Sequence, residues 1–232
     1  ALKWRQKAAD QGFVEAQYNL GFMYAEGEGV EQDFKEALMW RQKAADQGYA
    51  GAQYNLGLMY AKGLGVERDF KEALKWWQKA AEQGNAEAQS NLGVYYYTGQ
   101  GGEQDFKEAL KWYQKAADQG HAKAQSSIGV MYANGEGVEL DFKEAVKWYR
   151  KAADQGFVNA QNNLGVMYGF GKGTEQDYVT AYAWASIAIT NGNKDAPRFK
   201  SEFLEPKMTV DQIAKAEKLI KEMIKQNPKL LN

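Results

Sequence analysis

The sequence predicts an all-α protein built as a stack of helix pairs, and two observations support this prediction. The first is a fixed repeat, because tryptophan and glycine each recur every 36 residues along the 232-residue chain. The recurring positions are Trp4, Trp40, Trp76, Trp112, Trp148 and Trp184, and Gly12, Gly48, Gly84, Gly120, Gly156 and Gly192. The second is that each period holds two segments with helical spacing of apolar residues. A period of this length is typical of solenoids, in which stacked repeats bury one continuous core.

The first segment of each repeat, here termed helix A, spans about residues 14–25 in the first complete repeat. Its apolar stripe consists of Ala16, Leu20, Met23 and Tyr24. Gly21 lies inside this segment, where glycine costs roughly 1 kcal/mol relative to alanine. Glycine recurs there as Gly57, Gly93, Gly129 and Gly165. We therefore expect a neighbouring helix to approach too closely for a side chain.

The second segment, helix B, spans about residues 34–46 and has marked ends. Asp33 is a candidate N-cap and Glu36 follows three residues later, where carboxylates suit orphan N–H groups and the helix dipole. The same pair recurs as Asp69 and Glu72, Asp105 and Glu108, and Asp141 and Glu144. Gly48 suits the left-handed position just after the helix. Between the two helices, Gly27 and Gly29 indicate a turn, because a phosphate-binding loop would need a preceding strand and a following Lys-Ser/Thr.

The last 40 residues differ from the repeats. Residues 196–204 are expected to form a degenerate helix A, and residues 210–226 a helix that begins with a capping box at Thr209 and Gln212. Its apolar stripe is Ile213, Ala216, Leu219, Ile220 and Met223. One face can thus cover the last repeat while lysines face solvent, as a terminal cap requires. An amphipathic membrane helix is the rival interpretation. The tail, residues 227–232, is expected to be frayed.

The repeated motif resembles the Sel-1-like repeat (SLR), a relative of the tetratricopeptide repeat. Its elements are Ala-x-x-x-Leu-Gly-x-x-Tyr, Gly-x-Gly-Val-x-x-Asp and Ala-x-x-Trp-x-x-Lys-Ala-Ala-x-x-Gly. The resemblance implies a right-handed superhelix of antiparallel helix pairs whose concave face is lined by helix A. The solenoid is expected over residues 1–192, with a degenerate repeat and capping helix over 193–232. Its parts are a truncated half-repeat, 1–12, and repeats 13–48, 49–84, 85–120, 121–156 and 157–192.

Composition excludes several classes of partner and site. The formal net charge is −1, with 29 Lys and Arg against 30 Asp and Glu, and no basic stripe marks a nucleic-acid partner. The chain has no cysteine, so it has no disulfide or thiolate metal site. No apolar run is long enough to span a membrane. We expect a monomer.

Because the chain opens within a repeat, at least a half-repeat more is expected before residue 1, and a removed targeting segment is compatible with this. The resemblance suggests a periplasmic or secreted location, with a cytoplasmic one still open.

Residues that break the repeat were considered as candidate catalysts, and none is convincing. His121, the single histidine, occupies a position that also holds Phe13, Tyr49 and Asn85. Without a second His or Cys there is no metal cluster, and Ser90, Ser126 and Ser127 have no histidine in register. We therefore expect no enzymatic activity, no cofactor and no metal. The tryptophan ladder could stack sugars or bases, but its Ala and Leu neighbours favour a buried core.

Positions that vary between repeats are free to serve a ligand. In helix A, residues 15, 18, 22 and 26 share one face, and their equivalents differ from repeat to repeat. In tetratricopeptide proteins the equivalent face binds peptides, and the resemblance implies the same here. The predicted groove residues are Tyr18, Asn19, Phe22, Tyr54, Asn55, Leu58, Lys62, Asn91, Tyr97 and Asn163. The asparagines could pair with a peptide backbone or with a neighbouring repeat, and both interpretations stay open.

The sequence therefore predicts a non-enzymatic scaffold that binds a peptide or protein segment in the concave groove. One alternative is an envelope-associated enzyme acting on a cell-wall component. Another is a glycan- or peptidoglycan-binding protein, which exposed Tyr97 and Phe170 beside the groove would favour. The identity of the ligand is not encoded in any motif of the chain.

Overall fold

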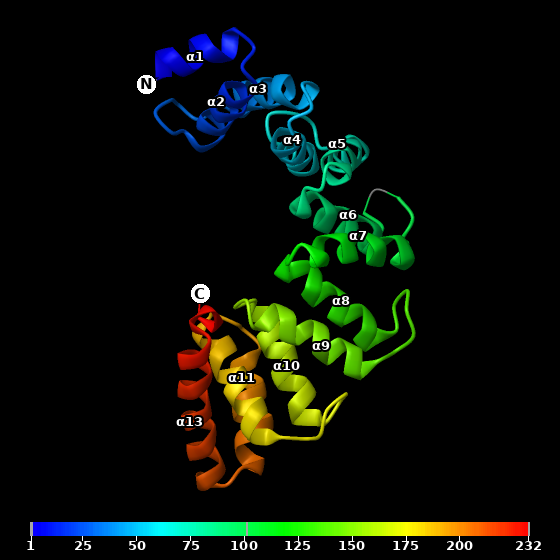
Figure 1. Ribbon diagram of the computed structural model, residues 1–232, viewed down its shortest axis with the longest axis vertical. Coiled ribbons are helices and arrows are strands. Elements are labelled where there is room, and N and C mark those ends of the chain that lie inside the picture. Colours follow the sequence, from blue (N-terminus) through cyan, green and yellow to red (C-terminus); the bar gives the residue numbers. More distant parts are fainter. Residues whose placement is uncertain (1, 101, 232) are drawn as a thin grey trace. The chain divides into compact units, whose positions relative to one another are not determined.

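The computed structural model describes residues 2–100 and 102–231, and within these ranges it has thirteen α-helices and no β-strand (Figure 1). The A helices are α2 (Val14–Glu26), α4 (Ala50–Lys62), α6 (Ala86–Thr98), α8 (Ala122–Asn134) and α10 (Val158–Phe170). The B helices are α1 (Leu2–Asp10), α3 (Phe34–Asp46), α5 (Phe70–Glu82), α7 (Phe106–Asp118), α9 (Phe142–Ala153) and α11 (Tyr178–Thr190). The predicted all-α fold of helix pairs is confirmed.

The chain forms two compact units, of which the first ends at Ala116 and the second begins at Ala117. Within the units, four A helices pack against the B helix of their own repeat: α2 on α3, α4 on α5, α8 on α9 and α10 on α11. Several B helices also pack against the A helix that follows them, as α3 does on α4, α5 on α6 and α9 on α10. Helices α3, α4, α5, α9 and α10 are therefore each held on two sides.

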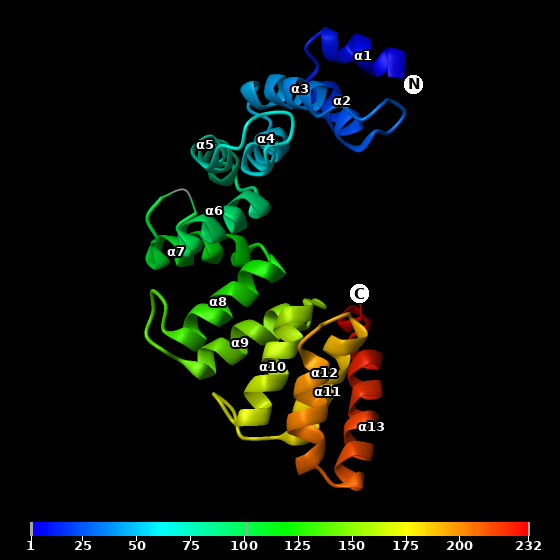
Figure 2. The ribbon, with the colours of Figure 1, turned by 180° about the vertical axis from the view of Figure 1, so that it is seen from behind.

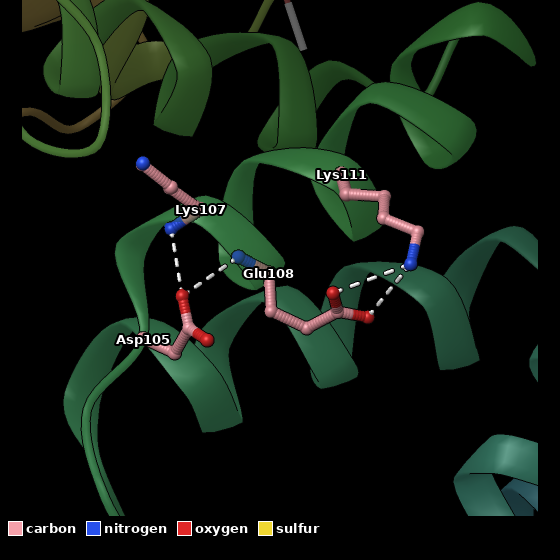
Figure 3. A network of polar contacts seen from close by, with 4 residues as sticks. All are labelled: Asp105, Lys107, Glu108 and Lys111. Atoms are coloured by element: carbon pink, nitrogen blue, oxygen red, sulfur yellow. Dashed lines mark hydrogen bonds and ion pairs between the residues drawn. The ribbon is translucent and has the colours of Figure 1, made fainter.

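The predicted caps of the B helices are present. At the start of α7, Asp105 Oδ1 accepts hydrogen bonds from the backbone N–H groups of Lys107 and Glu108, both at 3.0 Å (Figure 3). These bonds satisfy two of the N–H groups that a helix leaves unpaired at its start. Glu108 in turn pairs with Lys111 at 3.3 Å. After α3, Gly48 has φ +87°, so its place in the left-handed region is also confirmed.

The glycines inside the A helices mark close contacts with the partner B helix, as predicted. A Cβ at Gly57 would lie 2.5 Å from Cδ1 of Trp77 and 3.1 Å from the Ala73 carbonyl oxygen. A Cβ at Gly21 would lie 2.8 Å from Arg41 Cγ. The absent side chain lets α4 and α5 pack closely enough for the indole to cover the backbone of α4.

Five of the six periodic tryptophans are buried, which confirms the core interpretation for Trp40, Trp76, Trp112, Trp148 and Trp184. Trp76 packs against Ala44, Ala52 and Leu56 of the two preceding helices, α3 and α4. A lysine one turn later, Lys79, places its Nζ 4.1 Å from the Trp76 ring centre. For Trp4 the prediction was wrong, since 76% of this residue is exposed.

A ladder of buried glutamines, which the sequence analysis did not single out, ties successive helices together. Gln53 Nε2 donates to the Ala45 carbonyl at 3.1 Å, and Gln83 Nε2 donates to Gln53 Oε1 at 2.7 Å. The same two bonds recur around Gln17 and Gln125. A buried amide needs such partners, because an unpaired one costs free energy.

The C-terminal helix α13 (Val210–Gln226) covers the second unit as a cap. It lies beside α11 (Figure 2), with Ala216 buried and Ile213 and Ile220 packed on the same cluster. The predicted capping box is present: Gln212 N donates to Thr209 Oγ1 at 3.2 Å, and Thr209 N donates to Gln212 Oε1 at 2.8 Å.

In the C-terminal region one prediction is confirmed and another is wrong. The expected degenerate helix A is present over 196–204, as a short α-helix, α12 (Ala196–Arg198), that continues into a π-helical segment, η1 (Phe199–Leu204), and is followed by a 3-10 turn, η2 (Glu205–Lys207). The tail was predicted to fray, but Pro228–Leu230 forms a 3-10 turn, η3, and Leu230 is 2% exposed. Its carbonyl accepts hydrogen bonds from Gln161 Nε2 and Asn191 Nδ2. This tertiary pairing orders the tail, and residue 232 lies outside the described residues.

Candidate functional site

The ten predicted groove residues lie on A helices. Nine are in the first unit, namely Tyr18, Asn19 and Phe22 on α2, Tyr54, Asn55, Leu58 and Lys62 on α4, and Asn91 and Tyr97 on α6. The tenth, Asn163, is on α10 in the second unit. Phe22 is 43% exposed, and Asn19 and Lys62 are also exposed, whereas the other seven are half-buried. The predicted groove face is therefore only partly exposed.

Two of the predicted asparagines bond a neighbouring repeat. Asn55 Nδ2 donates to the Tyr18 hydroxyl at 3.1 Å, and the Asn91 side chain hydrogen-bonds the Tyr54 side chain. The Tyr18 ring also packs on Tyr49, with ring centres 4.9 Å apart. Burial raises the pKa of Tyr54, with a smaller effect of Glu87 in the same direction. At these positions the asparagine ladder has a structural role.

A surface pocket of about 420 Å³ lies in the first unit where α4, α5 and α6 meet. It is lined by Leu58, Ala61, Lys62, Arg68, Phe70, Trp77, Asn91, Val94, Tyr95 and Gln100. We call it the α4–α6 pocket. Three of the predicted residues, Leu58, Lys62 and Asn91, come together here. The other predicted residues of this unit are not among its lining, and the Tyr97 ring packs instead on Phe106, with centres 5.4 Å apart.

Arg68, in the loop after α4, is a pocket residue that was not predicted from the sequence. In three other repeats a glutamine occupies this position, and its side-chain amide donates a hydrogen bond to a backbone carbonyl at the end of helix A. Gln32 Nε2, for example, donates to the Ala25 carbonyl at 2.7 Å. Gln104 and Gln176 make the equivalent bonds, so in these repeats the loop is tied to helix A. Arg68 instead stacks its guanidinium on the Phe70 ring, 4.4 Å from the ring centre. Comparing this loop position between repeats would have found the departure.

The second unit holds a different pocket, of about 350 Å³, which we call the α8–α10 pocket. It is lined by Lys123, Ser126, Ser127, Val130, Phe157, Asn159, Asn162, Asn163, Asn193 and Asp195. Most of these side chains are polar, and Asn162 Oδ1 is buried without a hydrogen-bond partner among the described residues. Ser126 occupies the repeat position of Tyr18 and Tyr54, so a small residue stands where the first two complete repeats have a ring.

His121 has a structural explanation. Its Nδ1 accepts a hydrogen bond from the Ala124 N–H at 3.1 Å and so caps α8. Asn85 Oδ1 does the same for α6 through Ala88, at 2.8 Å. Within residues 2–100 and 102–231, no three His, Cys, Asp or Glu side chains gather as a metal site would require. In the same ranges, none of the helices is both long and apolar enough to cross a membrane.

The sequence matches the Sel1 repeat in six consecutive segments, residues 1–13, 14–49, 50–85, 86–121, 122–157 and 158–193. The chain belongs to the Sel1 repeat family. Proteins of this family are helical repeat scaffolds that usually mediate protein interactions. A search of curated proteins found no significant relative.

Solved structures of bacterial Sel1 repeat proteins are similar to this one. A Sel1 repeat protein from Oxalobacter formigenes is 36% identical with a TM-score of 0.81, and the match covers 92% of this chain and 85% of that one. A protective antigen of uropathogenic Escherichia coli with an SLR fold is 30% identical with a TM-score of 0.52, covering 98% and 64% respectively. A Sel1 repeat protein from Klebsiella pneumoniae, at 23% identity and a TM-score of 0.54 over 86% and 97%, shares the fold.

Proposed function

We propose that this Sel1 repeat protein is a non-enzymatic scaffold that binds a peptide or protein segment on the exposed face of its A helices. The observation that supports the proposal most directly is the α4–α6 pocket. It joins aromatic and aliphatic side chains with the amides of Asn91 and Gln100. Protein-binding surfaces combine these features, because apolar anchors supply affinity and amides pair with a peptide backbone.

The fold makes such a pocket rigid. Trp77 and Tyr95 are only 6% and 7% exposed, so most of each ring packs within the protein. Trp77 Nε1 also donates to the Tyr54 carbonyl at 3.3 Å. A pocket that exists before the ligand arrives loses little conformational entropy on binding.

The proposal can be tested by panning a phage-displayed random peptide library over the purified chain. Recovered peptides should bind the wild type in solution, and Leu58→Ser should weaken that binding by about tenfold or more. Met39→Ser is the matched control, because Met39 is an exposed apolar residue on the B helix α3. Because Leu58 also packs on the cluster around Trp77, circular-dichroism melts of all three proteins should establish that each is folded at the assay temperature. Recovery of no peptide, or equal binding by the Leu58 variant, would refute the proposal.

A second candidate function, glycan binding, is favoured by the amide-rich α8–α10 pocket. Amide and hydroxyl side chains offer both donors and acceptors, as sugar hydroxyls require. Of the two aromatic residues whose exposure would favour this function, Phe170 is exposed but its ring packs against Phe203, with ring centres 4.3 Å apart, and Tyr97 is half-buried. Titration with soluble peptidoglycan fragments, followed by NMR, tests this candidate. Binding should be lost in Ser126→Tyr, which places in this pocket the residue found at Tyr18 and Tyr54.

A further inference from the structure

We infer that the α4–α6 pocket selects an acidic peptide segment, with one large apolar side chain of that segment seated in the pocket and its carboxylates at the rim. This inference rests on the proposed function, since it names the chemistry of the peptide that the scaffold binds. Three features of the pocket support it: its apolar lining, its unpaired cations and its contrast with the preceding repeat.

The lining suits a single large apolar side chain. Leu58 and Ala61 of α4, Phe70 and Trp77 of α5, and Val94 and Tyr95 of α6 make up most of it. A volume of about 420 Å³ falls in the ~300–1,000 Å³ range of sites that hold small ligands. Burying an apolar side chain there removes it from water, which supplies the main favourable term.

The charged residues that line the pocket are both cations, Lys62 and Arg68. Both are exposed, and neither forms an ion pair with any carboxylate in the described parts of the chain. Arg68 is held over Phe70 at the end of the loop, where its planar guanidinium can donate two parallel hydrogen bonds to a carboxylate. The charge at the rim is therefore complementary to Asp and Glu side chains of a partner.

The preceding repeat shows that the fold does not need these cations. The residues equivalent to Lys62 and Arg68 are Glu26 and Gln32, and Gln32 closes the loop by its bond to Ala25. The charge at the rim is thus negative in the first complete repeat and positive in the second, and the glutamine that bonds the loop to helix A is replaced by an arginine. Since the same backbone accepts both sets of residues, we infer that the cations serve a ligand.

The experiment measures fluorescence anisotropy with three labelled probes, each about ten residues long. The first is an Asp/Glu peptide with one central Phe, the second replaces the Phe with Ala, and the third replaces every acidic residue with Lys. The test variant is Lys62→Glu/Arg68→Gln, which installs the residues of the preceding repeat. The matched control, Lys71→Glu/Lys107→Gln, makes the same charge change at exposed sites on α5 and α7.

We expect the wild type and the control to bind the first probe, and the test variant to bind it at least about tenfold more weakly. The Ala and Lys probes should bind the wild type more weakly by a similar factor, and added salt should weaken binding of the first probe. Equal binding of the acidic and lysine probes, or equal loss in test and control variants, would overturn the inference. If library peptides bind through Leu58 but show no acidic or apolar preference, the inference fails and the proposed function stands. If no peptide binds at all, both fail.

Discussion

The side-chain amide of Asn55 in α4 donates a hydrogen bond to the Tyr18 hydroxyl of α2, the A helix of the preceding repeat, at 3.1 Å. Asn91 and Tyr54 repeat this pairing one repeat further on. The bond crosses between two stacked A helices, so it holds neighbouring repeats in register. A residue predicted to face a ligand thus also stabilises the stack, and a variant at this position has to be tested for folding as well as for binding.

Tyr18→Phe removes the hydroxyl and keeps the ring, so it should cost about 0.5–1.5 kcal/mol in the free energy of unfolding. Urea denaturation followed by circular dichroism measures this change. In a double-mutant cycle with Asn55→Ala, the two effects should not add, because both remove the same bond. Additive effects would show that the bond contributes nothing to stability.

Trp76→Ala should destabilise the protein by roughly 3–5 kcal/mol, because it opens a cavity among Ala44, Ala52 and Leu56. Trp4→Ala is the control, since Trp4 is mostly exposed and its truncation leaves no cavity. Chemical denaturation of both variants measures the difference. A loss below about 1 kcal/mol for Trp76→Ala would contradict the buried position.

Gly57→Ala should destabilise by about 1–3 kcal/mol through overpacking against Trp77, despite the better helix propensity of alanine. The same substitution in a Trp77→Ala background should be neutral or stabilising, because the ring that it would strike is gone. Thermal melts of the four proteins of this cycle provide the measurement. A destabilisation that persists in the Trp77→Ala background would mean that the backbone of α5, at Ala73, sets the limit.

Leu230→Ala should destabilise the second unit by roughly 2–5 kcal/mol, because Leu230 packs into the cluster formed by Tyr149, Leu164 and Trp184. Leu231→Ala, at an exposed neighbouring position, should change stability little. Hydrogen exchange on α9 to α11 should report the loss locally. Equal melts for the two variants would restore the prediction of a frayed tail.

Asp154→Asn should stabilise the protein slightly at neutral pH. Burial raises the pKa of the Asp154 carboxyl above its ordinary value, although the attraction of Arg150 opposes this. The native state therefore binds more protons than the unfolded state between the two pKa values, and stability falls as the pH rises through that window. The gain should appear above the raised pKa and vanish at about pH 3, below the ordinary carboxyl pKa. We expect a small effect because the residue is partly exposed. Thermal melts across this pH range are the measurement. If the gain in stability persists at low pH, it comes from the effect of the substitution on the C-terminal end of helix α9 and not from the buried charge.

The sequence by itself determined the helix pairs, their caps and the close approach at Gly57. These features depend on neighbours within a single repeat, and the 36-residue period repeats each of them several times. Asp105 caps α7 whatever the rest of the protein does, because the N–H groups that it accepts from are two and three residues away.

Only the tertiary structure decided which residues share a pocket and which chain segments are ordered. Leu58, Arg68 and Val94 meet because α4, its following loop and α6 pack together, and nothing in the spacing of these residues shows that their side chains share one pocket. The burial of Leu230 likewise depends on the distant helices α9, α10 and α11, whose side chains cover it. Whether a side chain is buried, and which side chains meet in one pocket, depends on how the helices pack together. The periodic sequence therefore predicts the helices but not the site.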